Sequence, residues 1–151
     1  MLFKSCAVAL LSLLCISLPV AAEKKIIVPP EMAAKPGAPA LTFSPGVLVD
    51  GTLYVAGQMG TDTKTRQIPD KFEDEVTNAL DSIGLVLKAA GMTYSDVVSV
   101  TVFLTDMDLF GRMNAVYTAR FPDPRPARAT VGVAKLGSPK GHLEISVTAH
   151  K

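Results

Sequence analysis

The sequence predicts a single α+β domain, in which a mixed β-sheet carries two helices on one face in the order β-β-α-β-α-β-β. Three observations support this fold class. A hairpin signature joins two apolar runs at residues 47–58, an amphipathic stripe covers residues 72–90, and two strand-like runs close the chain at 125–134 and 142–149. Helices on one face leave the other face to solvent or to a second subunit. The mixed polarity expected on that face favours a subunit contact.

The first 22 residues are predicted to be a secretory signal peptide and are set apart from the fold. Lys4 is basic, residues 7–20 are almost entirely apolar, and Val20-Ala21-Ala22 provides small residues for cleavage. The apolar run is short for a transmembrane anchor, so we expect an exported, periplasmic protein that is not held in the membrane after cleavage. Residues 23–40, which are rich in proline, are predicted to be an extended lead-in, and residues 41–151 the folded domain.

Composition limits the classes of function. Cleavage would leave 129 of the 151 residues and remove both cysteines, Cys6 and Cys15, so the mature chain would have neither a disulfide nor a thiol nucleophile. Removal of Lys4 leaves 14 basic residues against 14 acidic ones. A neutral chain does not favour nucleic acid or an anionic membrane as a partner. His142 and His150 are the only histidines and are eight positions apart, so no metal site is predicted.

The first half of the domain contains the clearest local signals. Asp50-Gly51 between two apolar runs is typical of a two-residue hairpin, because a type I′ turn requires positive φ at both central positions. Glycines on both sides of Gln58 indicate a strand end where another group approaches the backbone closely. Asp70 is predicted to cap the next helix, with Glu73 completing a capping box. The inward stripe of that helix, which Gly91 ends, is Phe72, Val76, Leu80, Ile83, Leu87 and Ala90.

The second half begins with a β-branched run at residues 97–104 that predicts a buried strand. Asp106 or Asp108 is expected to cap a second helix. The prolines of residues 121–126 exclude a helix there, because each pushes the residue before it towards extended geometry. The inward residues of the second helix are predicted to be Leu109, Met113, Val116 and Tyr117.

The two closing strands carry the candidate chemistry. Side chains alternate along a strand, so Arg128 and Thr130 share a face of one strand, and Glu144 lies on a polar face of the other. We expect the cation of Arg128 and the carboxylate of Glu144 to meet across a ladder, in a site that binds an anion and moves a proton. The alternative is a solvated strand face with a cross-strand ion pair. The opposite face of the last strand is a core face composed of Leu143, Ile145, Val147 and Ala149.

Six segments, in order, resemble the RidA (YjgF) family of enamine/imine deaminases. The resemblance runs from Leu41 to Ala149, and it implies a chorismate-mutase-like fold and a homotrimer with three clefts between subunits. It also implies hydrolysis of 2-aminoacrylate and related enamines or 2-imino acids to 2-keto acids and ammonia, with no metal or organic cofactor. The segments are Gly57-Gln58, Leu87-Lys88-Ala89-Ala90-Gly91, Val102-Phe103-Leu104-Thr105-Asp106-Met107, Met113-Asn114-Ala115-Val116-Tyr117, Pro126-Ala127-Arg128-Ala129 and Leu143-Glu144-Ile145.

The resemblance also implies roles for individual residues. Arg128 matches the arginine that binds the substrate carboxylate, and Glu144 matches the acid beside the attacking water. Thr130 stands where the family places main-chain groups near the reacting centre, Gly57 matches a glycine that lines the cleft, and Asn114 matches a helix asparagine near the interface. These five residues form the expected substrate site together with Phe43.

Two positions depart from the family pattern and leave substrate preference open. Phe43 stands where many members carry a tyrosine that lines the pocket, and Ser146 replaces the second glutamate of a common Glu-Ile-Glu strand. Two further functions also stay open. A non-catalytic trimer that binds small carboxylates would need Arg128 without Glu144, and a chaperone-like protective protein would need neither.

Overall fold

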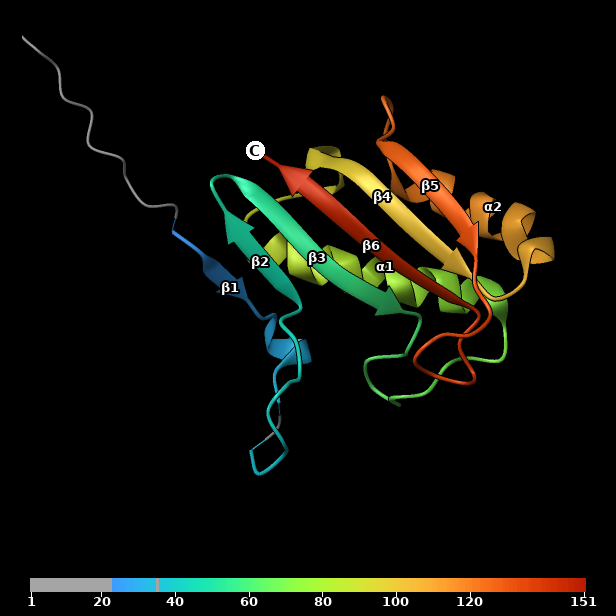
Figure 1. The fold of residues 1–151 in the computed structure, drawn as a ribbon, viewed down its shortest axis with the longest axis horizontal. Helices are drawn as coiled ribbons and strands as arrows, with labels where there is room; N and C mark the ends of the chain where they lie inside the picture. The colour runs from blue at the N-terminus through green and yellow to red at the C-terminus, as the bar shows by residue number, and fades with distance from the viewer. Residues whose placement is uncertain (1–22, 35) are drawn as a thin grey trace, which may run out of the picture.

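The computed structural model describes residues 23–34 and 36–151. Residues 1–22, which carry the predicted signal peptide, and residue 35 of the lead-in lie outside the described residues. Six strands form one sheet in the order β1-β2-β3-β6-β4-β5 (Figure 1). The elements are β1 (Lys25–Ile27), β2 (Gly46–Val49), β3 (Thr52–Met59), α1 (Phe72–Ala89), β4 (Val97–Leu104), α2 (Phe110–Arg120), β5 (Ala127–Gly132) and β6 (Leu143–His150), with short 3-10 helices at η1 (Pro30–Met32), η2 (Tyr94–Asp96) and η3 (Met107–Leu109).

The lead-in takes part in the sheet. Lys25–Ile27 forms the edge strand β1, which pairs antiparallel with β2. Ile27 is buried in the core, whereas Ile26 points to the opposite face and is exposed. The sheet therefore has one strand more than the sequence predicted, and this strand lies at the edge beside β2. Its short length, three residues, leaves little periodicity for a sequence pattern to reveal.

The predicted hairpin is present. Strands β2 and β3 pair antiparallel, with Val49 opposite Thr52. Asp50 and Gly51 have φ angles of 47° and 73°, as the type I′ turn requires. Strand β3 then carries a bulge between Val55 and Gln58. This irregularity lies beside Gly57, where a close approach was expected.

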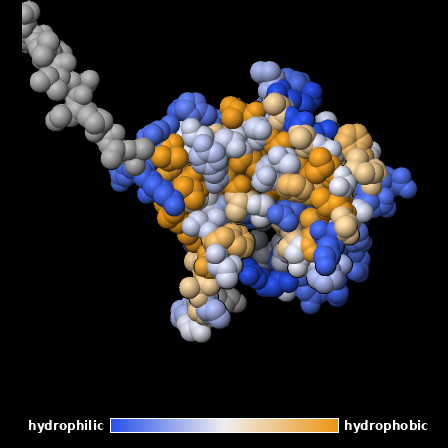
Figure 2. All heavy atoms as spheres, viewed as in Figure 1, coloured by the Kyte–Doolittle hydropathy of each residue, from blue (hydrophilic) through white to orange (hydrophobic). Residues whose placement is uncertain are grey.

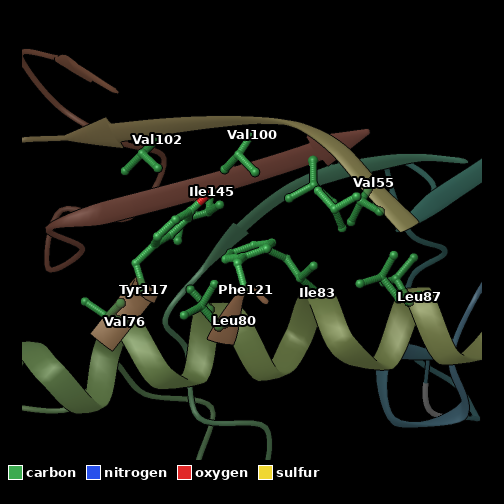
Figure 3. Packing of buried hydrophobic residues seen from close by; sticks show 14 of the residues in the cluster. Val55, Val76, Leu80, Ile83, Leu87, Val100, Val102, Tyr117, Phe121 and Ile145 are labelled. Carbon is green, nitrogen blue, oxygen red and sulfur yellow. The ribbon is translucent and has the colours of Figure 1, made fainter. Parts of the chain in front are cut away.

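Both helices pack on the same face of the sheet, which confirms the predicted layers (Figure 3). The inward side chains of α1 meet Tyr117 and Phe121 of the second helix region and the valines and isoleucine of the central strands. Phe121 and Tyr117 stack with ring centroids 4.4 Å apart. Burial of this apolar surface is the main stabilising contribution to the fold. The core residues labelled in Figure 3 are Val55, Val76, Leu80, Ile83, Leu87, Val100, Val102, Tyr117, Phe121 and Ile145.

The predicted cap of α1 is wrong. The helix begins after Lys71, whose side chain makes no capping hydrogen bond, and Asp70 lies one residue too early to cap it. Glu73 instead receives two hydrogen bonds from Arg112 of α2, at 2.7 and 3.0 Å. This bidentate contact lowers the pKa of the Glu73 carboxyl to about 2. A long-range ion pair has thus replaced the local capping box.

The predicted end of α1 at Gly91 and the predicted cap at Asp106 are confirmed, and η2 has a cap that was not predicted. Gly91 follows α1 with a φ of 72°, a conformation that glycine adopts without steric cost. Asp106 accepts a hydrogen bond from the backbone N–H of Asp108 and so caps η3, which leads directly into α2. The helix η2 has a capping box formed by Thr93 and Asp96.

Strand β6 lies in the middle of the sheet, antiparallel to both β3 and β4. Leu143, Ile145 and Ala149 are fully buried beneath the helices. The carboxylate of Glu75 in α1, also fully buried, secures the start of this strand. It accepts hydrogen bonds from the backbone N–H groups of His142 at 2.7 Å and Leu143 at 3.3 Å, and its second oxygen lies 2.8 Å from His142 Nδ1.

The sheet face opposite the helices is open in this chain. Figure 2 looks onto this face, on which hydrophobic and polar side chains are interspersed. Tyr54 and Val131 are 53% and 43% exposed, and Ile26 is exposed at the same side of the edge strand. The polar side chains of β6 point to this face, because their neighbours along the strand are buried on the other.

Replacing Glu75 with glutamine is predicted to destabilise the fold by about 2 kcal/mol or more. The neutral amide oxygen accepts the backbone N–H groups of His142 and Leu143 more weakly than a carboxylate does, and the N–H₂ group can only donate to His142 Nδ1, so the charge-assisted bonds at the start of β6 are lost. Chemical denaturation of E75Q beside the unmodified protein measures the change in the free energy of unfolding. The matched control is D74N, because the Asp74 side chain is 60% exposed in the same helical turn. Equal losses in the two variants would contradict this role of Glu75.

Candidate active site

Glu144 and Gly57 are in direct contact on the helix-free side of the sheet. Glu144 lies on β6 opposite Met59 of β3 and Phe103 of β4. Its carboxylate lies against the backbone of Gly57, so closely that a Cβ placed on Gly57 would overlap Glu144 Oε1 and come within 2.7 Å of Cδ. Any side chain at this position would therefore displace the Glu144 carboxylate from where it lies. The close approach that the sequence predicted near Gln58 is this contact.

Arg128 lies on β5 and packs against two aromatic rings. Its guanidinium carbon is 4.5 Å from the ring centroid of Tyr117 and 5.6 Å from that of Phe110, both in α2. Cation–π contacts of this kind hold the planar group in place and leave its N–H edges available for a ligand. Among the described residues, neither Arg128 nor Glu144 forms an ion pair.

Arg128 and Asn114 line one cavity of about 320 Å³, which also includes Tyr117 and Arg125. Burial raises the pKa of the Tyr117 hydroxyl, and the nearby Arg128 charge opposes this effect. Tyr117 thus remains neutral beneath the guanidinium. Thr130 lies on the same face of β5, and within the described chain its buried hydroxyl has no hydrogen-bond partner, as is also true of the Tyr117 hydroxyl.

Gly57 and Phe43 line a different cavity, of about 290 Å³. It lies between the segment after η1, the end of β3 and the loop that follows β3. Phe43 is 64% exposed, so its ring forms an open wall that another surface could cover. The six predicted site residues therefore fall into two groups. Glu144, Gly57 and Phe43 form one group, and the other contains Arg128, Thr130 and Asn114. Each group is called a half-site below.

The expected meeting of Arg128 and Glu144 across a ladder is wrong within one chain. Strand β4 lies between β5 and β6, with Val100 opposite Arg128 and Phe103 opposite Glu144. Two strand spacings and three residues along β4 separate the two backbones by roughly 14 Å. The side chains also point to opposite faces, since Arg128 contacts α2 whereas Glu144 is on the helix-free side. The two groups do not form one site in a single chain.

The reason is the connection through α2. Strand β5 follows β4 after a helical crossover and so pairs with it in parallel, at the edge of the sheet. The chain then returns to insert β6 between β3 and β4. Strands β5 and β6, which are consecutive in the sequence, are thus not neighbours in the sheet.

Sequence reasoning missed two residues that shape the site. Tyr117 was assigned only to the core, but its ring also supports Arg128. Glu75 was not singled out, although it lies three positions after Phe72 and thus on the inward side of α1. An acidic residue at an inward helix position is a usable signal, because such a group is rarely buried without partners.

Two further findings concern metal binding and membrane crossing. No group of three or more His, Cys, Asp or Glu side chains in residues 23–34 and 36–151 is arranged to hold a metal ion. None of the helices in the described part of the chain has the length and apolarity that a membrane crossing demands.

The fold agrees with what comparison to known proteins shows. The sequence model described as endoribonuclease L-PSP matches residues 32–151. The chain belongs to this family, to which the RidA proteins also belong.

Three relatives illustrate the similarity. The chain is 43% identical over 109 residues to the 2-iminobutanoate/2-iminopropanoate deaminase of Rattus norvegicus, covering 71% of this chain and 78% of that protein. The crystal structure of RidA from an Antarctic Psychrobacter superimposes with a TM-score of 0.75 and 33% identity, over 84% of this chain and 99% of that one. The structure of Escherichia coli TdcF with bound serine superimposes with a TM-score of 0.73 and 29% identity, over 84% of this chain and 98% of that one.

Replacing Gly57 with alanine is predicted to lower the turnover of any reaction that depends on Glu144, on the order of 100-fold. The added methyl group must displace the carboxylate, because the strand backbone cannot move away. Activity assays and the melting temperature together test this. The control is G111A, since a methyl group on Gly111 of α2 has no neighbour within 4 Å. Retention of activity in G57A would show that the position of Glu144 is unimportant.

Proposed function

We propose that this protein is an imine deaminase, which hydrolyses reactive enamines and 2-imino acids to 2-keto acids and ammonia in clefts between the subunits of a homotrimer. The observation that carries the proposal is the separation of Arg128 from Glu144. Both are charged, unpaired among the described residues and located in separate half-sites. A neighbouring subunit could complete each half. Relatives named as deaminases support the choice of reaction.

The open face of the sheet supports the assembly. Tyr54 and Val131 are large, apolar and exposed there. Contact between subunits over this face would bury such side chains, and this burial would stabilise the trimer. The proposed cleft then combines Glu144, Gly57 and Phe43 of one subunit with Arg128 and Asn114 of the next.

The half-site around Arg128 is suited to the carboxylate of an imino acid. A guanidinium donates two parallel hydrogen bonds to a carboxylate, and the rings of Tyr117 and Phe110 prevent it from turning away. Binding at this end would place the imine carbon at a defined distance from the other half-site. The serine bound in the structure of E. coli TdcF supports a ligand of this chemical type.

Glu144 supplies the proton transfers in this proposal. With an enamine substrate, it delivers a proton to the β-carbon, and the imine forms. Glu144 then orients a water molecule, accepts its proton as the C–O bond forms, and returns that proton to the nitrogen. Collapse of the tetrahedral intermediate breaks the C–N bond while the hydroxyl proton passes to Glu144, which gives the 2-keto acid and ammonia and restores the acid for the next enamine. Imines also hydrolyse unaided in water, so a site with few groups provides sufficient acceleration, and neither a metal nor an organic cofactor is needed.

The family description also names ribonuclease activity. The formal net charge of +1 does not favour a polyanionic substrate. The alternative that keeps specific support is a trimer that binds small carboxylates without catalysis, because the Arg128 half-site by itself meets that need. Retention of Glu144 in contact with Gly57 favours the enzyme.

Two single variants separate binding from chemistry. R128A is predicted to abolish the release of 2-keto acid from enzymatically generated imines, because the substrate carboxylate loses its partner. E144Q keeps the shape of the side chain but loses the acid, so kcat should fall about 100-fold or more with little change in KM. Circular dichroism confirms folding of each variant. Full activity of R128A would show that Arg128 has no role in the mechanism. A wild-type protein without activity would favour the carboxylate-binding alternative.

Mixed trimers test whether the two residues act from different subunits. Co-expression of R128A and E144Q chains in equal amounts should restore about a quarter of wild-type activity, since one interface in four then has both functional residues. Differently tagged chains allow mixed trimers to be purified from the homotrimers, and mass measurement verifies their composition. Each purified mixed trimer has one functional interface of its three, so its activity should rise to about a third of the wild-type value. A mixture as inactive as its parents would place both residues in one subunit or deny the trimer.

A further inference from the structure

The cavity around Gly57 and Phe43 lies next to a second cavity of about 670 Å³. Thr61 and Arg66, in the loop between β3 and α1, line both cavities and so mark the boundary between them. The far wall of the second cavity is formed by Lys140 and His142, just before β6. Gly57, which the Glu144 carboxylate contacts, lines the first cavity, so a molecule held against Gly57 would lie in the same cavity as Arg66.

The second cavity has more cationic than anionic groups. Arg66 and Lys140 contribute two permanent positive charges, and Asp70 the one carboxylate among its lining residues. In the first cavity, Glu31 is the carboxylate that faces the same space as Arg66. Neither Arg66 nor Lys140 lies within 4.0 Å of a carboxylate in the described chain. Both cations are therefore available to an anion that enters the cavity.

The backbone of Arg66 is held in an uncommon conformation. Its φ of 63° lies in the left-handed region, which a non-glycine residue adopts only where its surroundings impose it. The Arg66 N–H donates to the Asp62 carbonyl at 2.9 Å, and the Asp62 N–H donates to the Gln67 carbonyl at 2.8 Å. Asp62 Oδ1 also accepts from the N–H groups of Lys64 and Thr65. This loop presents Arg66 from a backbone that is already ordered.

The opposite wall is equally fixed. The buried carboxylate of Glu75 bonds to both the backbone N–H and the ring Nδ1 of His142. His142 therefore cannot swing into the cavity and fill it. Lys140 lies two residues before His142 in the same segment. Hydrogen bonds thus hold the backbone of Arg66 on one side of the cavity and His142 on the other, which limits the ordering that a ligand must impose.

We propose that Arg66, assisted by Lys140, forms an anion subsite for the side chain of the substrate, so that the protein prefers 2-imino acids whose side chain carries a second carboxylate. This inference rests on the proposed deaminase function. The first carboxylate binds Arg128 of the neighbouring subunit, the imine carbon lies beside Glu144, and the side-chain carboxylate extends past Gly57 to Arg66. A neutral short-chain imine makes no use of the subsite.

The experiment compares two imines in the purified, full-length assembly. Oxidation of L-glutamate by an amino-acid oxidase, with catalase present, provides 2-iminoglutarate, and oxidation of L-2-aminobutyrate provides neutral 2-iminobutanoate. The R66Q variant is expected to lower kcat/KM for 2-iminoglutarate at least tenfold more than for 2-iminobutanoate, mainly through a higher KM. The control is K64Q, which removes the same charge from the same loop but from a residue that lines neither cavity. It should leave the ratio of the two substrates unchanged.

A binding measurement keeps the inference testable without turnover. Calorimetric titration with 2-oxoglutarate and 2-oxobutanoate should show tighter binding of the dicarboxylate, and R66Q should remove the difference. Equal affinities in the unmodified protein, or an R66Q variant that affects both substrates alike, would overturn the subsite. Absence of acceleration on either imine, with the preference for 2-oxoglutarate intact, would refute the deaminase function and leave the subsite standing.

Discussion

The position of β6 between β3 and β4 is the constraint on which the site depends. Alternate side chains of this strand are buried beneath α1 and α2, so the remaining ones must point to the helix-free face. Glu144 is the first of these. Its carboxylate lies over Gly57, in the space that a Cβ at that position would take. The buried Glu75 carboxylate secures the beginning of β6 and thereby helps to hold Glu144 in place.

Arg128 is held by a different set of contacts at the other end of the sheet. Strand β5 is an edge strand, and the guanidinium is positioned by the aromatic rings of α2 rather than by an acidic partner. The arginine is thus fixed in place while its charge is left available. In the proposed trimer, this cation and the Glu144 carboxylate meet only when subunits assemble. Folding of one chain would then be insufficient for catalysis, and assembly would complete the site.

Much of the fold could be predicted from local patterns. The hairpin at Asp50-Gly51, the stripe of α1 and the strand at Val97–Leu104 depend on residues that are close in the sequence, so their periodicity and turn chemistry were sufficient. The cap of α1 was not predictable in this way. Glu73 pairs with Arg112, which is 39 positions away, and no local pattern contains that information. Strand β1 has three residues, too few for a periodic signal.

The candidate site shows the same division. The sequence by itself determined which residues are candidates for the chemistry, and the alternation within each strand determined which neighbours share a face. It also provided the predicted signal peptide, which lies outside the described residues. Only the tertiary structure decided that β4 separates Arg128 from Glu144 and that Arg66 borders two cavities. Strand order depends on how a helical crossover returns to the sheet, and that is a property of the whole packed chain and of no single segment.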